Sequence, residues 1–201
     1  MTDVPASAER RTIPWADGRW TTPPVATEET DDGLVVTAAE GSDAWRVTSY
    51  GFVHDTEHAL VAPLAPGRAV EVTFSADFSE QFDQAGVFVR ASGDTWIKTG
   101  VEFADGVLGL GAVVTDGVSD WSTAPVPEWT GHRIVVRVSR SGDAVTVRAR
   151  REDEAFRLVR VAPFPEDVPV EVGPFLCAPT RSGLRVVFRS WIETDADAAL
   201  H

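Results

Sequence analysis

The stretch "DQAGVFVRASGDTWIKTGVEFADG", residues 83–106, decides the fold, because it is typical of two β-strands joined by a tight turn. Alternate residues of an extended strand point to opposite faces. On the second strand, Ile97 and Val101 therefore share one face, and Lys98 and Glu102 share the other. The apolar face indicates a sheet packed on a core. The opposite face carries Lys98, the only lysine of the chain, and needs another explanation.

The two strands are predicted to pair as antiparallel neighbours over residues 84–91 and 95–104. The predicted core face consists of Ala85, Val87, Val89, Ile97, Val101 and Phe103. The predicted outer face consists of Gln84, Gly86, Phe88, Arg90, Trp96, Lys98, Gly100 and Glu102. Glycines leave room for a ligand, charged side chains hydrogen-bond hydroxyls, and an aromatic ring stacks on a sugar, so this face predicts a carbohydrate-binding groove. The alternative is a solvated sheet face with a Lys98–Glu102 ion pair.

The rest of the chain repeats the same pattern of short alternating segments separated by Gly and Asp turns. "RIVVRVSR" and "AVTVRARR" flank the turn at 141–143. Earlier in the chain, Asp-Gly turns occur at 104–106 and 115–117. No window shows helical periodicity. Many strands without intervening helices predict an all-β antiparallel sandwich or jelly roll.

Length and composition limit the function classes. The 201 residues predict a single domain over 1–201, with fraying of 1–12 and 196–201. A net charge of −13 argues against nucleic-acid and anionic membrane partners. We find no signal-peptide pattern and no membrane-span pattern, which predicts a cytoplasmic protein. Any dimer, such as a homodimer, would form through sheet edges or sandwich faces.

Four motifs carry a family resemblance: "YGFVHD" at 50–55, "DQAG" at 83–86, "WIKTGVE" at 96–102 and "SDWS" at 119–122. In order and spacing they resemble the regulation-of-enolase-protein family, a domain-of-unknown-function family. The resemblance covers about residues 14–193. It implies a concanavalin A-like lectin/glucanase jelly roll, an all-β sandwich of two antiparallel sheets of which one is concave. A fold does not fix a function.

The resemblance also implies which side chains gather in one groove. The predicted ligand-binding residues are Tyr50, His54, Gln84, Lys98, Glu102 and Trp121, with Arg90, Trp96 and Asp83 as further candidates. The expected ligand is a carbohydrate or another small polyhydroxylated molecule, stacked on Trp121 or Trp96. Structural roles are the alternative: His54 fixes a turn, Trp121 closes one end of the sandwich, and Asp83 accepts hydrogen bonds in a turn.

The chain departs from the catalytic pattern of the glucanase branch, whose members carry Glu-x-Asp-x-Glu or Glu-x-Asp-x-x-Glu. Neither spacing occurs here, and Glu102 stands alone on its strand. Retaining hydrolysis needs a second carboxylate about 5 Å away. An enzyme that acts on a sugar, either a hydrolase or a lyase or isomerase using Glu102, His54 and Lys98, is one alternative function. A non-catalytic regulatory module that binds a protein partner is another.

No metal or cofactor is predicted. His54 and His58 are spaced to share a strand face, but a complete metal site needs three or four ligands. Cys177 is the only cysteine, so it forms no intramolecular disulfide, and its apolar context predicts a small buried side chain.

Overall fold

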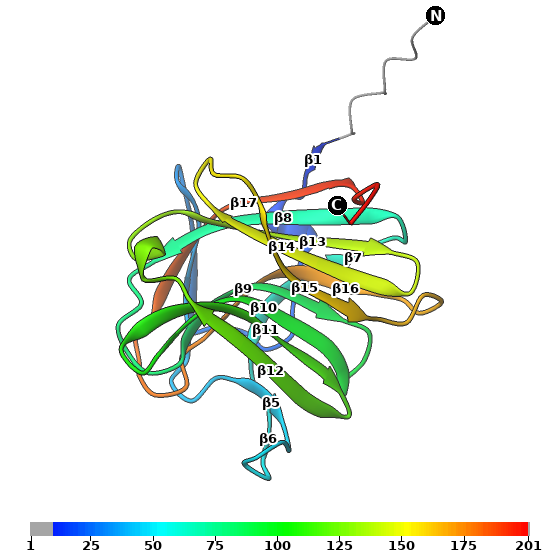
Figure 1. Ribbon diagram of the computed structural model, residues 1–201. Helices are drawn as coiled ribbons and strands as arrows, with labels where there is room; N and C mark the ends of the chain where they lie inside the picture. Colours follow the sequence, from blue (N-terminus) through cyan, green and yellow to red (C-terminus); the bar gives the residue numbers. More distant parts are fainter. Residues whose placement is uncertain (1–9, 201) are drawn as a thin grey trace, which may run out of the picture.

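The computed structural model describes residues 10–200, which form two antiparallel sheets stacked face to face (Figure 1). The eight-stranded sheet has the order β15-β14-β13-β8-β17-β4-β3, and β1 pairs with β17. Its strands are β1 (Arg11–Thr12), β3 (Ala26–Thr30), β4 (Gly33–Thr37), β8 (Arg68–Ala76), β13 (Ile134–Ser141), β14 (Ala144–Arg151), β15 (Arg157–Pro163) and β17 (Arg185–Asp195). The predicted two-sheet antiparallel sandwich is confirmed.

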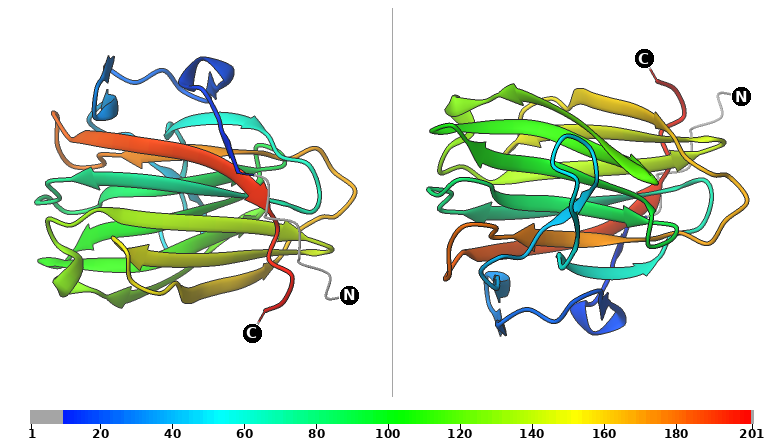
Figure 2. Two further views of the ribbon diagram at one scale, coloured as in Figure 1. Left: turned by 90° about the horizontal axis from the view of Figure 1, so that it is seen from above. Right: turned by 90° about the horizontal axis from the view of Figure 1, so that it is seen from below.

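The seven-stranded sheet has the order β12-β11-β10-β9-β16-β7-β2. Its strands are β2 (Arg19–Trp20), β7 (His58–Pro63), β9 (Asp83–Arg90), β10 (Thr95–Ala104), β11 (Val107–Asp116), β12 (Val118–Pro125) and β16 (Glu171–Cys177). A separate hairpin of β5 (Ala44–Arg46) and β6 (Val53–Asp55) crosses the outer face of this sheet, as the view from below in Figure 2 shows.

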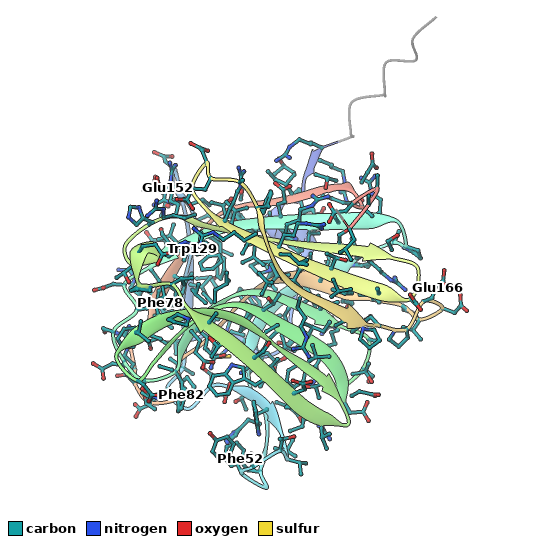
Figure 3. All side chains as sticks on the ribbon, in the orientation of Figure 1. Phe52, Phe78, Phe82, Trp129, Glu152 and Glu166 are labelled. Atoms are coloured by element: carbon teal, nitrogen blue, oxygen red, sulfur yellow. The ribbon has the colours of Figure 1, made fainter. Side chains whose placement is uncertain are left out.

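The decisive hairpin pairs as predicted. β9 and β10 are antiparallel neighbours, with Glu102 opposite Gln84 and Lys98 opposite Phe88. The predicted inner-face residues are in the core between the two sheets, Phe103 being only partly buried there. Figure 3 shows side chains filling this space, with Phe78 and Trp129 at one end. The outer face of β9 and β10 is left to the residues of the candidate site.

The predicted turns have the backbone that Asp-Gly sequences favour. Asp105 and Gly106 both have positive φ, 54° and 80°, between the paired residues Ala104 and Val107. Both central residues of a type I′ turn need positive φ, and this turn matches the twist of the strands. The short β10–β11 connection keeps both strands in register up to their ends.

The glycines of the outer face have a structural reason. Gly86, Gly100 and Gly111 face one another across β9, β10 and β11. A Cβ at Gly86 or Gly111 would lie 2.0 Å from a carbonyl oxygen of the neighbouring strand, and one at Gly100 would lie 2.2 Å from Ala85 O. The glycines therefore permit close approach of the strands themselves, a structural role in addition to the predicted one of leaving room for a ligand.

Both ends of the described chain, where fraying is predicted, make hydrogen bonds to the sandwich. Arg11 and Thr12 pair with β17, and the Asp197 amide donates a hydrogen bond to Ser139 Oγ at 2.8 Å. Residues 1–9 and 201, where fraying was also expected, lie outside the described residues. Helix within 10–200 amounts to the 3₁₀ turns η1 (Trp15–Asp17) and η2 (Pro127–Trp129), and no helix there could span a membrane.

Candidate functional site

The β5–β6 hairpin is anchored on the outer face of the seven-stranded sheet by a small apolar cluster. The cluster contains Ala44, Trp45, Ala59, Val61, Phe88, Trp96, Val113, Phe175 and Cys177. A hydrogen bond from the Arg46 amide to Ser119 Oγ, 2.9 Å long, ties β5 to the edge strand β12. The hairpin is thereby held as a fixed wall over the sheet.

Between the hairpin and the sheet lies a cavity of about 380 Å³, which we call the hairpin cavity. Its floor is polar and is formed by Asp43, Gln84, Lys98 and Glu102. Its walls are aromatic and come from Trp45, Tyr50, Phe52 and His54 of the hairpin, with Phe82 and Trp121 on the sheet side. Figure 3 labels Phe52 on the hairpin and Phe82 beside the sheet. The volume falls in the range of small-molecule sites.

Lys98 is held in the floor by two polar partners. Its Nζ donates to Asp43 Oδ1 at 2.8 Å and to Gln84 Oε1 at 2.9 Å, and Gln84 Nε2 donates to the same Asp43 oxygen at 3.4 Å. Lys98 is only 4% exposed. Burial alone would lower the pKa of Lys98, but the carboxylates of Asp43 and Glu102 outweigh it and raise the pKa. Lys98 is therefore a fixed ammonium group.

Asp43 occupies the base of the hairpin and is fixed by the backbone. Its Oδ1 also accepts a hydrogen bond from the Ala44 amide at 2.8 Å, and its own carbonyl accepts one from the Thr56 amide at 2.9 Å. The carboxylate that neutralises Lys98 is thus supplied by the same segment that positions the wall.

Glu102 lies beside this pair without an equivalent partner. Within residues 10–200 the structure has no hydrogen bond to its carboxyl group. Burial raises the pKa of Glu102 to about 7; Lys98 opposes this shift and Asp43 adds to it. An acid with a pKa near neutrality exchanges its proton readily under ordinary conditions, which is a frequent property of functional sites.

The hairpin wall is a continuous series of rings. Trp45 and Tyr50 meet edge to face with centroids 5.6 Å apart, Tyr50 stacks on Phe52 at 5.3 Å, and Phe52 meets His54 at 4.6 Å. The side chains of Tyr50 and Phe52 are exposed, as is Trp121 on β12. These rings offer apolar faces at the mouth of the cavity.

The loop that carries Tyr50 has a strained backbone. Val47 and Ser49 have φ of 65° and 64°, a region that β-branched residues such as valine rarely adopt. Hydrogen bonds from the Val47 amide to Phe52 O at 2.7 Å and from Trp45 Nε1 to Thr48 O at 3.0 Å hold this conformation. Strain of this kind clusters at functional sites, where neighbouring contacts keep it in place.

The structure brings the six principal predicted residues together and separates the other three. Tyr50, His54, Gln84, Lys98, Glu102 and Trp121 all line the hairpin cavity. Trp121 lies on the edge strand β12. Arg90 and Trp96 instead line a smaller cavity of about 130 Å³ together with Asp55 and Glu57. Because Trp96 is buried and stacks on Phe88, a ligand in the hairpin cavity cannot reach it.

Asp83 is a structural residue, so its proposed ligand role was wrong. It is fully buried, and its Oδ2 accepts hydrogen bonds from the Ser79 and Glu80 amides and from Arg181. Alternation along β9 already excluded it, because Asp83 precedes Gln84 and must face the opposite side. The turn-acceptor alternative describes it correctly.

Several lining residues were missed because they lie in loops or, like Trp45, in the short strand β5, which belongs to neither sheet of the sandwich. Asp43, Trp45, Phe52, Phe82, Pro179 and Thr180 also line the hairpin cavity. For Asp43 a signal existed, since a buried lysine needs an acidic partner, but the chain holds 31 acidic residues and their order does not identify the right one. Phe52 lies within the "YGFVHD" motif and could have been included.

His58 and Cys177 have structural roles. The Ala39 amide donates to His58 Nε2 at 3.0 Å, and Nδ1 lies 3.0 Å from Thr22 O, so both ring nitrogens are occupied. This rules out the pairing of His54 with His58 that we considered. Cys177 is fully buried in the apolar cluster beneath the hairpin, and burial raises the pKa of its thiol well above the usual value. No group of three potential metal ligands occurs within residues 10–200.

Several solved structures have the same β-sandwich fold as this chain. A xylan β-1,4-xylosidase from Bacillus halodurans C-125 aligns with a TM-score of 0.65 over 84% of this chain and 34% of that one, at 14% identity. An identity this low establishes the sandwich fold alone. A crystal structure of a functionally unknown protein from Saccharomyces cerevisiae aligns with a TM-score of 0.87 and 31% identity, covering 92% of this chain and all of that one (100%).

Sequence comparison gives the family. "Regulation of enolase protein 1" of Saccharomyces cerevisiae is 32% identical over 194 residues, which are 96% of this chain and 98% of the relative. The model of the family described as "Protein of unknown function (DUF1349)" matches residues 20–195, which include the hairpin, the cavity floor and all strands of both sheets except β1 and the first residue of β2. The chain therefore belongs to the DUF1349 family.

Proposed function

We propose that the protein binds a mono- or short oligosaccharide, or a similar small polyhydroxylated molecule, in the hairpin cavity. The observation that carries this proposal is the combination of a polar floor with aromatic walls. Asp43, Gln84, Lys98 and Glu102 offer donors and acceptors for hydroxyl groups, while Tyr50 and Trp121 offer ring faces. Sugar rings present both kinds of surface.

The geometry favours a small ligand over a protein partner. A protein-binding module would present a broad apolar face, whereas here the apolar groups surround a cavity of about 380 Å³ with a charged floor. The floor residues are held by hydrogen bonds among themselves, so they are positioned before a ligand arrives. Preorganisation of this kind reduces the cost of binding.

The test is a screen of purified protein for thermal stabilisation by neutral, aminated and acidic saccharides, followed by calorimetric titration of each hit. A ligand at ten times its dissociation constant stabilises the folded state by about 1.4 kcal/mol. Trp121→Ala should weaken binding without unfolding the protein, since the side chain is 41% exposed. Leu158→Ala, which truncates a similarly exposed side chain at 49% on β15, is the control and should leave binding unchanged. A screen in which no saccharide binds would overturn the proposal.

Acid–base catalysis on the bound sugar is a second candidate, favoured by the position of Glu102. The group has a pKa of about 7, and a second carboxylate, Asp43, lines the same cavity. In an isomerase, the Glu102 carboxylate would remove a proton from the hydroxyl-bearing carbon next to a carbonyl group and return it to the former carbonyl carbon, while the hydroxyl proton moves to the former carbonyl oxygen. Incubation of each bound sugar in D₂O, monitored by NMR, would reveal exchange that Glu102→Gln abolishes. If the sugars bind without exchange or conversion, the protein is a binding module.

A further inference from the structure

The hairpin cavity has an imbalance of charge that selects among saccharides. Lys98 supplies the positive charge in the floor of the cavity, and the Asp43 carboxylate neutralises it through a hydrogen bond of 2.8 Å. Glu102 is then a second carboxyl group for which the described residues provide no hydrogen bond and no ion pair. With Glu102 ionised, the floor holds two negative charges against one positive charge.

The groups around Glu102 do not remove this imbalance. Lys98 faces it from the same strand, Gln84 from β9, and Asp43, Tyr50 and His54 from the hairpin segment. Cys177, in β16 beneath the hairpin, is a neutral thiol because burial raises its pKa. Arg46 is turned toward Asp55, 3.4 Å away, and does not line the cavity.

The walls suit a cation as well. A cation over the face of a tryptophan, tyrosine or phenylalanine is attracted by the ring quadrupole, and a nearby carboxylate adds to this attraction. The hairpin cavity combines Trp45, Tyr50, Phe52 and Trp121 with the unpaired carboxyl group of Glu102. An anionic sugar would instead meet two carboxylates. The net charge of −13 also attracts cations to the surface.

Building on the proposed saccharide binding, we propose that the hairpin cavity selects an amino sugar whose protonated amine lies between Glu102 and the aromatic rings of Tyr50 and Trp121. The ammonium group supplies the positive charge that the floor lacks. Lys98 and Gln84 remain in place to bind the hydroxyl groups.

The experiment is a calorimetric titration with matched sets of glucose, galactose and mannose, each as the parent sugar, the 2-amino sugar, its N-acetyl form and the uronate. In at least one set the amino sugar should bind about tenfold more tightly than the parent, because a charge-assisted contact and a cation–π contact are gained. The N-acetyl form keeps the nitrogen but loses the charge, and should lose most of this preference.

Two variants locate the effect. Glu102→Gln should reduce the ratio of amino-sugar to parent-sugar affinity to about one, and Tyr50→Leu, at a side chain that is 59% exposed, should reduce it partly. Glu128→Gln, in η2 away from the hairpin cavity, is the matched control and should keep the ratio. Near pH 7 the amino sugar should also displace a proton from Glu102 of the wild-type protein, seen as a buffer-dependent binding enthalpy, and Glu102→Gln should remove this release and leave only the proton exchange of the sugar amine itself.

The outcomes separate the two proposals. If neutral sugars bind as tightly as their amino forms, or uronates bind best, amine selection is wrong while saccharide binding stands. If no sugar of any charge binds, both proposals are wrong. A tenfold preference that survives Glu102→Gln would also overturn the assignment, because the charge would then be recognised elsewhere.

Discussion

The outer faces of the two sheets carry hollows of similar size with different contents. The hollow on the eight-stranded sheet has a volume of about 440 Å³ and contains Arg10, Glu71, Arg137, Arg148 and Asp197, whereas the hairpin cavity measures about 380 Å³. On the first face each of these charges has an opposite partner: Glu71 pairs with Arg10 and Arg137, and Asp197 pairs with Arg137 and Arg148. On the second face Glu102 has none among the described residues. The two hollows therefore differ more in the pairing of their charges than in volume. The unpaired carboxyl group of Glu102 is what marks the hairpin cavity as the candidate site.

The coverings differ as well. The C-terminal residues Asp195 and Asp197 cover the ionic face through pairs with Arg68, Arg137 and Arg148. The β5–β6 hairpin covers the other face with aromatic rings and leaves a cavity beneath them. The C-terminal aspartates thus complete the ion pairs of the eight-stranded sheet. The hairpin instead encloses a cavity in which the carboxyl group of Glu102 has no ion-pair partner among the described residues.

The largest expected effect comes from Lys98→Met. It leaves the Asp43 carboxylate in the floor without its cation and should destabilise the protein by about 3 kcal/mol. Arg185→Met, which breaks an exposed pair with Glu28, should cost less than about 1 kcal/mol. Urea unfolding of both variants measures the difference. A Lys98→Met loss as small as that of Arg185→Met would mean that the buried pair contributes nothing.

A double-mutant cycle sharpens this test. Asp43→Asn combined with Lys98→Met removes both charges, so the double variant should be less destabilised than the sum of the single variants by about 1 kcal/mol or more. Additive losses would contradict the pairing of the two residues.

Glu102→Gln and Glu71→Gln should change the free energy of unfolding in opposite directions above pH 7. The folded-state pKa of Glu102 lies above its ordinary value of 4.5, so its ionisation is unfavourable in the folded protein. The contribution of Glu102 to stability should therefore fall as the pH rises from about 4.5 to about 7, by at most about 3 kcal/mol, which is measured as the difference between wild type and Glu102→Gln. Glu102→Gln removes this loss and should be the more stable protein above pH 7.

Glu71→Gln should instead destabilise the protein at neutral pH by about 1–3 kcal/mol, because Arg137 loses a buried partner at 3.0 Å. Unfolding of both variants at pH 5 and pH 8 provides the comparison. If the two substitutions changed stability alike at pH 8, the difference between the faces would disappear.

A smaller effect is expected for the hairpin tether. Ser119→Ala removes the acceptor of the Arg46 amide and a 2.9 Å hydrogen bond to Thr115, and should cost about 1 kcal/mol. Hydrogen exchange should accelerate at the amide of Arg46 and in the hairpin while β9 and β10 stay protected. Unchanged exchange in the hairpin would show that the apolar cluster alone holds it.

Alternation along the strands predicted much of the fold and part of the site. The parity of β9 and β10 placed Val87 and Ile97 in the core and Gln84, Lys98 and Glu102 on the outer face, because a strand repeats every two residues. Tyr50, His54 and Trp121 came from the family resemblance, since no local rule connects a distant hairpin to a sheet face.

The errors have equally physical causes. Arg90 and Trp96 lie on the same face of the sheet as Lys98. The β5–β6 hairpin separates these two residues from Lys98, so they line a different cavity. Asp43 and Phe82 belong to loops, whose positions depend on tertiary packing rather than on periodicity. The sequence could therefore predict that a carboxylate pairs with Lys98, but it could not predict which acidic residue provides that carboxylate.

The most direct test of the account is an NMR titration of the Glu102 carboxyl carbon, with Glu193 in the eight-stranded sheet as an internal comparison. Burial would raise the pKa of Glu193, but hydrogen bonds from Arg11 and Arg68 hold it below 4.5. We predict a midpoint near 7 for Glu102 and below 4.5 for Glu193. A Glu102 midpoint at or below 4.5 would mean that its charge is already satisfied, and the hairpin cavity would then lack the unpaired acid on which its proposed role depends.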